Sequence, residues 1–398
     1  MKFQVSERRN RCDPKHARNS EGYTVQQTEC ETSQGEERRE APVKPRVHGG
    51  NIRGALVRYG IDEKRIIDLS SNVNPLGPSS AAKRAAKKAL DFIDRYPDPD
   101  MTDLRRAIAR YHGIKPEQVI CGNGSNELIH LVPRVFRPRK VLVPQPTFTE
   151  YAAAAEAAGG VVHALPLKEK DGFRVDPLEM AFALKGADMA FLCNPNNPTG
   201  LLIPKTDMLE VARYAAENGA KLVVDEAFMD FIDGESVLKE AVQASGLICL
   251  RAFTKFFGMP GLRIGYAVSD ETTIAALRAG QEPWTVNIPA AQAAIVALQD
   301  WRHIKKTLRV IEKERPRLLA ALRILPGVEL FPSVANFLFI KVSSAESTLL
   351  VEKLALRGLL VRDCSTFTGL DGRFLRIAVR TRRENERLIQ ALRELMHR

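Results

Sequence analysis

Short apolar runs alternate with helical segments over the middle of the chain. The runs that predict buried strands are Gln118–Cys121, Lys140–Val143, Val161–Leu167, Met189–Cys193, Lys221–Val224 and Gly246–Leu250. The helical segments between them are Ser125–Val135, Thr149–Ala158 and Thr206–Asn218. Glycines stand where helix C-caps belong, at Gly159, Gly160 and Gly219. Strands that alternate with helices predict an α/β fold, in which helices cover a mostly parallel sheet.

The regions on either side of this alternation show other patterns. Before it, Ile66–Pro75 predicts a short strand and loop, followed by helices at Ala81–Leu90 and Leu104–Tyr111. After it, we expect one long helical stretch, Ala290–Leu325, and a final helix, Arg383–Met396. The strands expected between these two helices are Val328–Leu330, Asn336–Lys341, Leu359–Arg362 and Phe374–Val379. This last region therefore has an α+β pattern.

The length and these patterns predict a division into domains. At 398 residues, the chain exceeds one typical domain. Residues 1–47 are charged and polar without a period, and we expect a disordered or loosely attached extension. Residues 48–75 are expected to form an arm that joins the small domain. The large domain is then residues 76–285, and the small C-terminal domain is residues 286–398.

Composition favours a cytoplasmic globular protein. Hydrophobic residues make up 44% of the chain and charged residues 27%. No apolar run approaches the roughly 20 residues that cross a bilayer, and the N-terminus lacks the apolar stretch of a secretory signal. The six cysteines are scattered without C-x-x-C spacing, which indicates reduced thiols and neither a disulfide framework nor a metal site.

The formal net charge of +11 allows two interpretations. Either the surface is simply basic, or the chain attracts a small anionic substrate. Nucleic acid is not favoured as a partner, because no helix-turn-helix, zinc-finger or RNA-binding signature is present.

One stretch combines a lysine and an arginine in a setting suited to a cofactor. It reads R-A-F-T-K-F-F-G-M-P-G-L-R-I-G-Y and covers Arg251–Tyr266. Lys255 falls just past an apolar strand and among phenylalanines. Removal from water lowers the pKa of a lysine amine and makes it a usable nucleophile. Arg263 follows between two glycines, beside which a phosphate has room. A covalently bonding lysine with a phosphate-binding arginine suggests pyridoxal phosphate (PLP), although the segment alone fits a surface lysine equally well.

Three further loops follow predicted strands, where ligands of open parallel sheets bind. Gly122–Asn126 (G-N-G-S-N) leads into a helix and could approach a phosphate with its backbone. Asn197 lies in N-P-N-N-P-T-G, and Asp225 ends an apolar strand, where a carboxylate needs a partner such as a pyridinium nitrogen. Phe148 offers an aromatic face. Each has a purely structural alternative when taken singly, as a turn or a core side chain.

In combination, the motifs N-N-P-T-G, V-V-D-E-A-F and T-K-(x7)-R-I-G resemble those of fold-type-I PLP enzymes of the class I/II aminotransferase superfamily. The resemblance covers roughly residues 48–398 and implies that fold, with a large and a smaller domain. It implies that Lys255 bonds the cofactor covalently, that Asp225 pairs with its ring nitrogen, that Asn197 holds its ring oxygen and that Phe148 stacks on the ring.

The resemblance also assigns the phosphate and a partner subunit. It implies that Gly124, Ser125, Asn126 and Arg263 bind the cofactor phosphate. Tyr96, in a Y-P-D-P turn, would reach the phosphate of the neighbouring subunit's cofactor. A homodimer with active sites at the subunit interface is therefore expected.

Two positions depart from the superfamily pattern. Phe228 stands where typical aminotransferases carry a tyrosine whose hydroxyl bonds the cofactor ring oxygen. Ala252 stands where relatives usually place a serine on the phosphate, so one anchor is missing unless Thr254 replaces it.

Three further stretches resemble the L-threonine-O-3-phosphate decarboxylases of cobalamin side-chain synthesis. They are H-G-G-N at 48–51, V-R-D-C at 361–364 and the run at 375–387. Phe228 also fits these enzymes. The resemblance implies decarboxylation of threonine phosphate to (R)-1-amino-2-propanol O-2-phosphate. The alternative is the histidinol-phosphate aminotransferases of histidine biosynthesis, which share most cofactor motifs and also take a phosphorylated substrate.

By this resemblance a set of residues lines the substrate pocket: His48, Gly49, Asn197, Arg362 and Arg376. The physical argument is independent, because a substrate with a carboxylate and a phosphate requires cations, and arginine binds either anion in bidentate fashion. Which arginine takes which anion stays open. A ligand-binding regulator with a DNA-binding domain is the contrasting class, but the 47-residue extension is too short and unpatterned for a winged helix.

Overall fold

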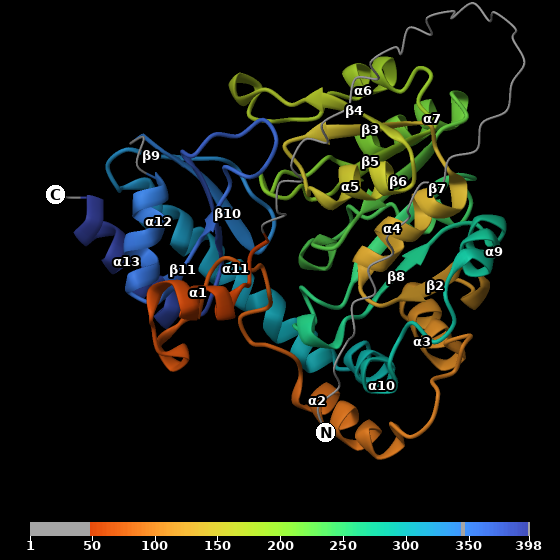
Figure 1. Ribbon diagram of the computed structural model, residues 1–398, viewed down its shortest axis with the longest axis horizontal. Helices are drawn as coiled ribbons and strands as arrows, with labels where there is room; N and C mark the ends of the chain where they lie inside the picture. Colours follow the sequence, from red (N-terminus) through yellow and green to blue (C-terminus); the bar gives the residue numbers. More distant parts are fainter. Residues whose placement is uncertain (1–47, 344–346, 397–398) are drawn as a thin grey trace, which may run out of the picture. The chain divides into compact units, whose positions relative to one another are not determined.

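The computed structural model describes residues 48–343 and 347–396, and Figure 1 shows the arrangement of their elements. The expected N-terminal extension, residues 1–47, lies outside the described residues. Within the part that is described, no helix is both long enough and apolar enough to span a membrane.

A seven-stranded sheet forms the centre of the larger part of the fold (Figure 1). Its strands, in spatial order, are β2 (Val119–Gly122), β8 (Gly265–Val268), β7 (Leu247–Ala252), β6 (Lys221–Asp225), β5 (Met189–Cys193), β3 (Lys140–Gln145) and β4 (Val161–Pro166). Strand β8 runs antiparallel to both its neighbours, and the other pairs are parallel. The α/β prediction is confirmed. Strand β8 was not predicted, because its four residues directly follow the Arg263 motif and are too few to show a period.

Both faces of this sheet are buried. Leu247 and Cys249 on β7 pack into one hydrophobic cluster, whereas Ile248 and Leu250 pack into another. Strands covered on both sides lack a polar alternation, which is why they appear in the sequence as continuous apolar runs.

The covering helices include the three that the sequence predicted: α4 (Ser125–Phe136), α5 (Glu150–Ala157) and α7 (Lys205–Glu217). Further helices, not predicted, are α6 (Pro177–Ala183), α8 (Leu238–Ala241) and α9 (Glu271–Gly280).

The beginning of the described chain packs against its end. Helix α1 (Ile52–Tyr59) is followed by β1 (Ile67–Asp68), which pairs in parallel with β11 (Leu359–Leu360). Helices α2 (Ser80–Ala89) and α3 (Thr102–His112) then lead to the large sheet. The chain therefore passes the C-terminal region before it enters the seven-stranded sheet.

The C-terminal region contains a four-stranded antiparallel sheet. Its order is β12 (Arg362–Asp363), β13 (Phe374–Ala378), β10 (Phe337–Val342) and β9 (Val328–Leu330). Helices α12 (Ser347–Leu356) and α13 (Arg382–Met396) accompany it.

Two expectations for this region were wrong. The stretch 290–325 is two helices, α10 (Ile288–Ala297) and α11 (Trp301–Arg323), because the Asp300 side chain accepts a hydrogen bond from the His303 amide and starts a new helix. The single strand expected at 359–362 is divided between β11 and β12, which belong to different sheets.

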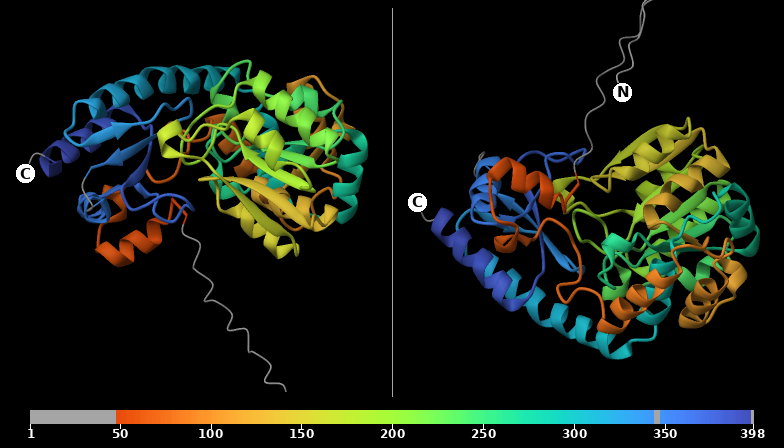
Figure 2. Two further views of the ribbon diagram at one scale, coloured as in Figure 1. Left: turned by 90° about the horizontal axis from the view of Figure 1, so that it is seen from above. Right: turned by 60° about the horizontal axis from the view of Figure 1, so that its bottom comes forward.

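The long helix α11 runs from the region of the large sheet to the small C-terminal sheet (Figure 2). Near its N-terminal half, the Thr307 hydroxyl accepts a hydrogen bond from the Asn74 side chain, which also donates to the carbonyl of Phe256 beside Lys255. Towards its C-terminal end, α11 packs against β9 and β10. The helix thus ties the Lys255 segment to the small sheet.

A buried ion network fixes the ends of β6 and β7 relative to each other. Arg251 on β7 donates to the Glu226 carboxylate at 3.0 Å, to Asp230 at 2.7 Å and to the Ser236 hydroxyl at 2.9 Å. The side chains of Arg251, Glu226 and Asp230 are all buried. Because Glu226 directly follows the last residue of β6, this network holds the two strand ends that carry the candidate chemistry.

We expect Arg251→Met to reduce the free energy of unfolding by about 3–5 kcal/mol, because two buried carboxylates lose their cation. Denaturant unfolding measures the loss. The matched control is Arg213→Met on α7, whose pair with Glu217 is exposed, and it should leave the unfolding midpoint unchanged. A loss below about 1 kcal/mol for Arg251→Met would show that the network does not stabilise the strand ends.

Candidate active site

The loops that carry the candidate site residues meet at the carboxyl edge of the large sheet. Cys193 on β5 pairs in register with Asp225 on β6, and Asp225 pairs with Leu250 on β7. Beyond these strand ends lies a cavity of about 330 Å³. It is lined by most of the residues predicted from the sequence: His48, Gly49, Ser125, Asn126, Phe148, Asn197, Asp225, Lys255, Arg263, Arg362 and Arg376.

Asp225 is a buried carboxylate with neutral hydrogen-bond partners. It is 4% exposed and accepts from the Tyr151 hydroxyl at 2.8 Å and from the Ala227 amide at 3.0 Å. Burial raises its pKa, although these hydrogen bonds and the charge of Lys255 oppose the shift. A cation placed against this carboxylate would therefore be strongly favoured.

Lys255 projects into the same cavity. Burial lowers its pKa to about 8, and the neighbouring cations Arg376 and Arg263 add to this effect, while Asp225 opposes it. Its Nζ lies 5.8 Å from the centroid of the Phe228 ring. The structure therefore places a buried lysine with a lowered pKa just beyond the end of β7, and such an amine can act as a nucleophile near neutral pH.

A cradle for an anion forms where α4 begins. Gly124 has φ 82°, and a Cβ built on it would lie 2.6 Å from Nη2 of Arg263. A Cβ on Gly265 would lie 2.3 Å from the Ser125 amide nitrogen. Only glycine fits at either position, so the backbone at the start of α4 can approach a ligand closely. The buried Asn126 Oδ1 has no hydrogen-bond partner in the described parts of the chain.

Two buried arginines come from the small sheet. Arg376 on β13 donates to Asn197 Oδ1 and, at 2.6 Å, to the Ser70 carbonyl. Burial lowers its pKa to about 10, with the charge of Arg362 contributing. Arg362 on β12 donates to the Thr366 hydroxyl at 2.7 Å. Strands β12 and β13 pair Arg362 with Arg376 directly, which places both guanidiniums at one wall of the cavity.

Tyr96 is not part of this cavity. Its side chain belongs to an 80% exposed residue, and its ring lies 4.8 Å from that of Trp284. The role predicted for it concerns a second subunit and stays a prediction. Gly124 also does not line the cavity but lies against Arg263.

Sequence reasoning missed several residues of the site. Tyr151 holds Asp225, and Asn72 and Glu150 line the cavity. The side chain of Asn72 is buried, at 1% exposed, and its Oδ1 and Nδ2 atoms have no hydrogen-bond partner among the residues that the structure describes. The available signal was the short spacing from Phe148, which precedes α5, to Tyr151 in its first turn.

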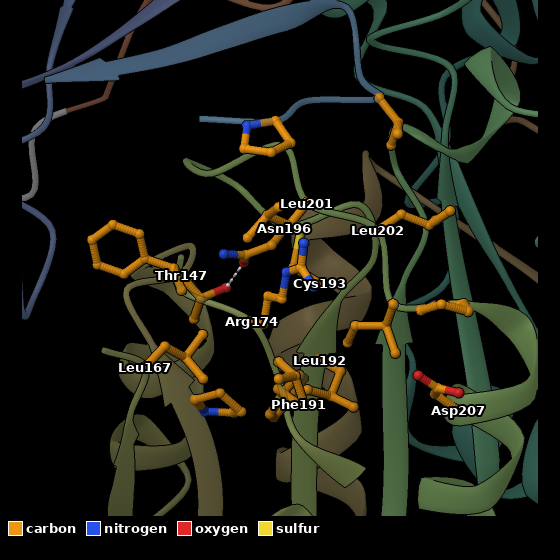
Figure 3. A pocket seen from close by; sticks show the side chains of 17 residues that line it. Thr147, Leu167, Arg174, Phe191, Leu192, Cys193, Asn196, Leu201, Leu202 and Asp207 are labelled. Carbon is orange, nitrogen blue, oxygen red and sulfur yellow. Dashed lines mark hydrogen bonds between the residues drawn. The ribbon is translucent and has the colours of Figure 1, made fainter. Parts of the chain in front are cut away.

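A second cavity, of about 390 Å³, lies next to the first (Figure 3). Asn196 lines it, whereas the next residue, Asn197, lines the first cavity. Its lining is mainly apolar, and the Thr147 hydroxyl donates to Asn196 Oδ1 at 2.7 Å (Figure 3). None of the residues predicted from the sequence for the cofactor or the substrate lines this second cavity.

Comparison with known proteins gives the family. Residues 64–392 match the family described as aminotransferase class I and II. The chain is 38% identical to threonine-phosphate decarboxylase of Salmonella typhimurium over 88% of this chain and 96% of that one. It is 37% identical to histidinol-phosphate aminotransferase 2 of Archaeoglobus fulgidus over 84% and 94%. Among solved structures, L-threonine-O-3-phosphate decarboxylase from Porphyromonas gingivalis matches with a TM-score of 0.76 and 26% identity, covering 84% and 100%.

The chain therefore belongs to the aminotransferase class I and II family and is a PLP-dependent enzyme. The expected resemblance to threonine-phosphate decarboxylases is confirmed at the level of sequence and fold. The described residues fit the cofactor on their own evidence. Among the described residues Asp225 accepts hydrogen bonds from a hydroxyl and a backbone amide, which are neutral, and Lys255 has an amine with a lowered pKa. The Gly124–Asn126 cradle with Arg263 suits a phosphate.

We expect the reactivity of Lys255 in the cofactor-free protein to rise with pH around a midpoint of about 8. The neutral amine is the reactive form, and an ordinary lysine becomes neutral only near pH 10.4. Reductive methylation at a series of pH values, followed by peptide mass analysis, measures the midpoint residue by residue. A Lys255 midpoint above pH 10 would contradict the assigned burial.

Proposed function

We propose that this enzyme decarboxylates L-threonine O-3-phosphate to (R)-1-amino-2-propanol O-2-phosphate, a reaction of cobalamin biosynthesis. The observation that carries the proposal is the pair of buried arginines, Arg362 and Arg376, which share one cavity with Lys255 and His48. Two guanidiniums that line one cavity can each bind an anion in bidentate fashion. A substrate with both a phosphate and a carboxylate supplies two.

The cofactor defines what the residues must do. PLP, when bound, draws electrons from the α-carbon of the substrate, so that a bond at that carbon can break heterolytically. Asp225 would hold the cofactor's ring nitrogen, and the start of α4 with Arg263 would hold its phosphate. The choice of bond then falls to the residues that orient the substrate.

Orientation by the remote phosphate supports decarboxylation. If some combination of His48, Arg362 and Arg376 holds the phosphate, the substrate is anchored at the end away from its α-carbon, and rotation about that carbon is fixed. The bond from the α-carbon to the carboxylate can then be the one that breaks. Carbon dioxide leaves, the electron pair stays at the α-carbon, and Lys255 in its ammonium form delivers a proton to that carbon and becomes the neutral amine.

Phe228 adds support for this chemistry. Its side chain is buried, its ring lies 5.1 Å from that of Phe337 in an edge-on contact, and its face is towards the Lys255 amine. A phenyl ring offers no hydroxyl donor at this point of the cavity. Phe228, which replaces the tyrosine of typical aminotransferases, therefore lies beside the Lys255 side chain that is proposed to move the proton.

Amino transfer from histidinol phosphate is the second candidate. It is supported by the 37% identity to the Archaeoglobus fulgidus enzyme, which is close to the 38% identity to the Salmonella decarboxylase. The cofactor-binding residues serve either reaction, and the two substrates share a phosphate.

We expect the PLP-loaded enzyme to release carbon dioxide from threonine phosphate and to act on unphosphorylated threonine at least about a hundredfold more slowly. The reason is the loss of charge-assisted hydrogen bonds worth roughly 1.5–3 kcal/mol each. Carbon dioxide release and product mass measure the reaction. Rapid amino transfer from histidinol phosphate to 2-oxoglutarate, without carbon dioxide from threonine phosphate, would replace this proposal by the second candidate.

We also propose a homodimer in which Tyr96 reaches the cofactor phosphate of the neighbouring subunit. The support is the exposure of Ile93 and Tyr96, at 70% and 80%, next to the half-exposed Trp284. Such a cluster is suited to an interface. Sedimentation should give twice the chain mass of 44.3 kDa, and Tyr96→Phe should weaken PLP retention. A monomer at micromolar concentration would contradict this assembly.

A further inference from the structure

Glu150, the first residue of α5, is a buried carboxylate at the wall of the active-site cavity. It is 5% exposed, and two imidazoles share it. Its Oε1 lies 3.1 Å from Nε2 of His48, and its Oε2 lies 3.2 Å from Nε2 of His130. A carboxylate at such a depth requires partners of this kind.

The two imidazoles come from different elements and face different surroundings. His130 lies on α4, the helix whose N-terminus forms the anion cradle, and it does not line the cavity. His48 belongs to the segment before α1 and does line it. The His48 ring also lies 5.8 Å from the ring of Phe148, tilted by 52°. Glu150 and Phe148 together therefore hold the His48 ring at the cavity.

The backbone beside His48 is fixed from the other side. A Cβ built on Gly49 would lie 2.1 Å from the Ser70 carbonyl oxygen, so only glycine fits there. The Gly50 amide donates to the Ser70 hydroxyl at 2.8 Å. The same Ser70 carbonyl accepts from Arg376. Ser70 thus contacts both the backbone next to His48 and the side chain of Arg376.

The contact with Glu150 leaves one ring nitrogen of His48 for a ligand. The 3.1 Å ion-pair contact with the carboxylate engages Nε2, so Nδ1 is the nitrogen that can meet a substrate atom. When the ring carries both protons, Nδ1 donates to an anion. A phosphate oxygen would then complete a chain from carboxylate through imidazole to phosphate.

We propose that Glu150 is a positioning residue that selects a phosphorylated substrate by holding His48 in place for the phosphate. His130, which does not line the cavity, contacts the other carboxylate oxygen of Glu150 at 3.2 Å. The inference rests on the proposed function only in taking the substrate's phosphate as the anion.

The test uses the PLP-loaded enzyme and two probes that cannot lose carbon dioxide. O-phosphoethanolamine carries an amine and a phosphate, and ethanolamine carries the amine alone. Their dissociation constants are obtained from the change in the visible absorption of the bound cofactor. The readout is the ratio of the two constants, which a merely structural role of Glu150 would not move.

We expect Glu150→Ala to weaken O-phosphoethanolamine binding by roughly tenfold or more and ethanolamine binding by less than about twofold. His48→Ala should give the same loss, and the double variant should be no worse than His48→Ala, because the two residues act through one contact. Glu150→Gln keeps the volume and should show a smaller loss in the same direction. The matched control is Glu156→Ala, an exposed position on the same helix, with no change.

Two results would overturn the inference. One is phosphate selectivity that is unchanged in both Glu150 variants while their unfolding temperatures match that of the parent. The other is losses for Glu150→Ala and His48→Ala that add in the double variant. Failure of the proposed function looks different, because selective binding of O-phosphoethanolamine, and its dependence on Glu150, would persist in an enzyme that releases no carbon dioxide from threonine phosphate.

Discussion

The site depends on two oppositely perturbed groups at the ends of adjacent strands. Asp225 closes β6 as a buried carboxylate with a raised pKa, and Lys255 follows β7 as an amine with a pKa lowered to about 8. Burial disfavours the charged form of each. A ligand with a cationic nitrogen for Asp225 and an aldehyde for Lys255 relieves both, and PLP has both groups.

The rest of the fold serves to keep these groups in place. The Arg251–Glu226–Asp230 network fixes the ends of β6 and β7 beneath them. Tyr151 reaches Asp225 from α5, and glycines at 124 and 265 let the start of α4 close on Arg263. From the opposite side, the small sheet contributes Arg362 and Arg376. The small sheet thus supplies the arginines proposed to bind the substrate, and the large sheet supplies the residues proposed to bind the cofactor.

The parallel sheet, and the residues that gather in one cavity at the ends of its strands, could be predicted because they lie on local patterns. An apolar run followed by Asp225, or by Lys255 and Arg263, shows both a strand and the chemistry at its end. Other features depend on tertiary contacts that no local pattern records. Glu150 was missed because its partners, His48 and His130, are distant in sequence, and β8 was missed because its four residues form a strand only between β2 and β7. The break before α11 depends on one cap, Asp300, inside a continuous helical pattern.

The most direct test of the central claim is the protonation state that Asp225 imposes on its partner. Nitrogen NMR of the enzyme loaded with 15N-labelled PLP reports whether the ring nitrogen carries a proton. The buried carboxylate should hold that nitrogen in its protonated form at neutral pH, and Asp225→Asn should shift the signal to that of a neutral pyridine. A neutral ring nitrogen in the unmodified enzyme would contradict the electrostatic pairing on which this site is built.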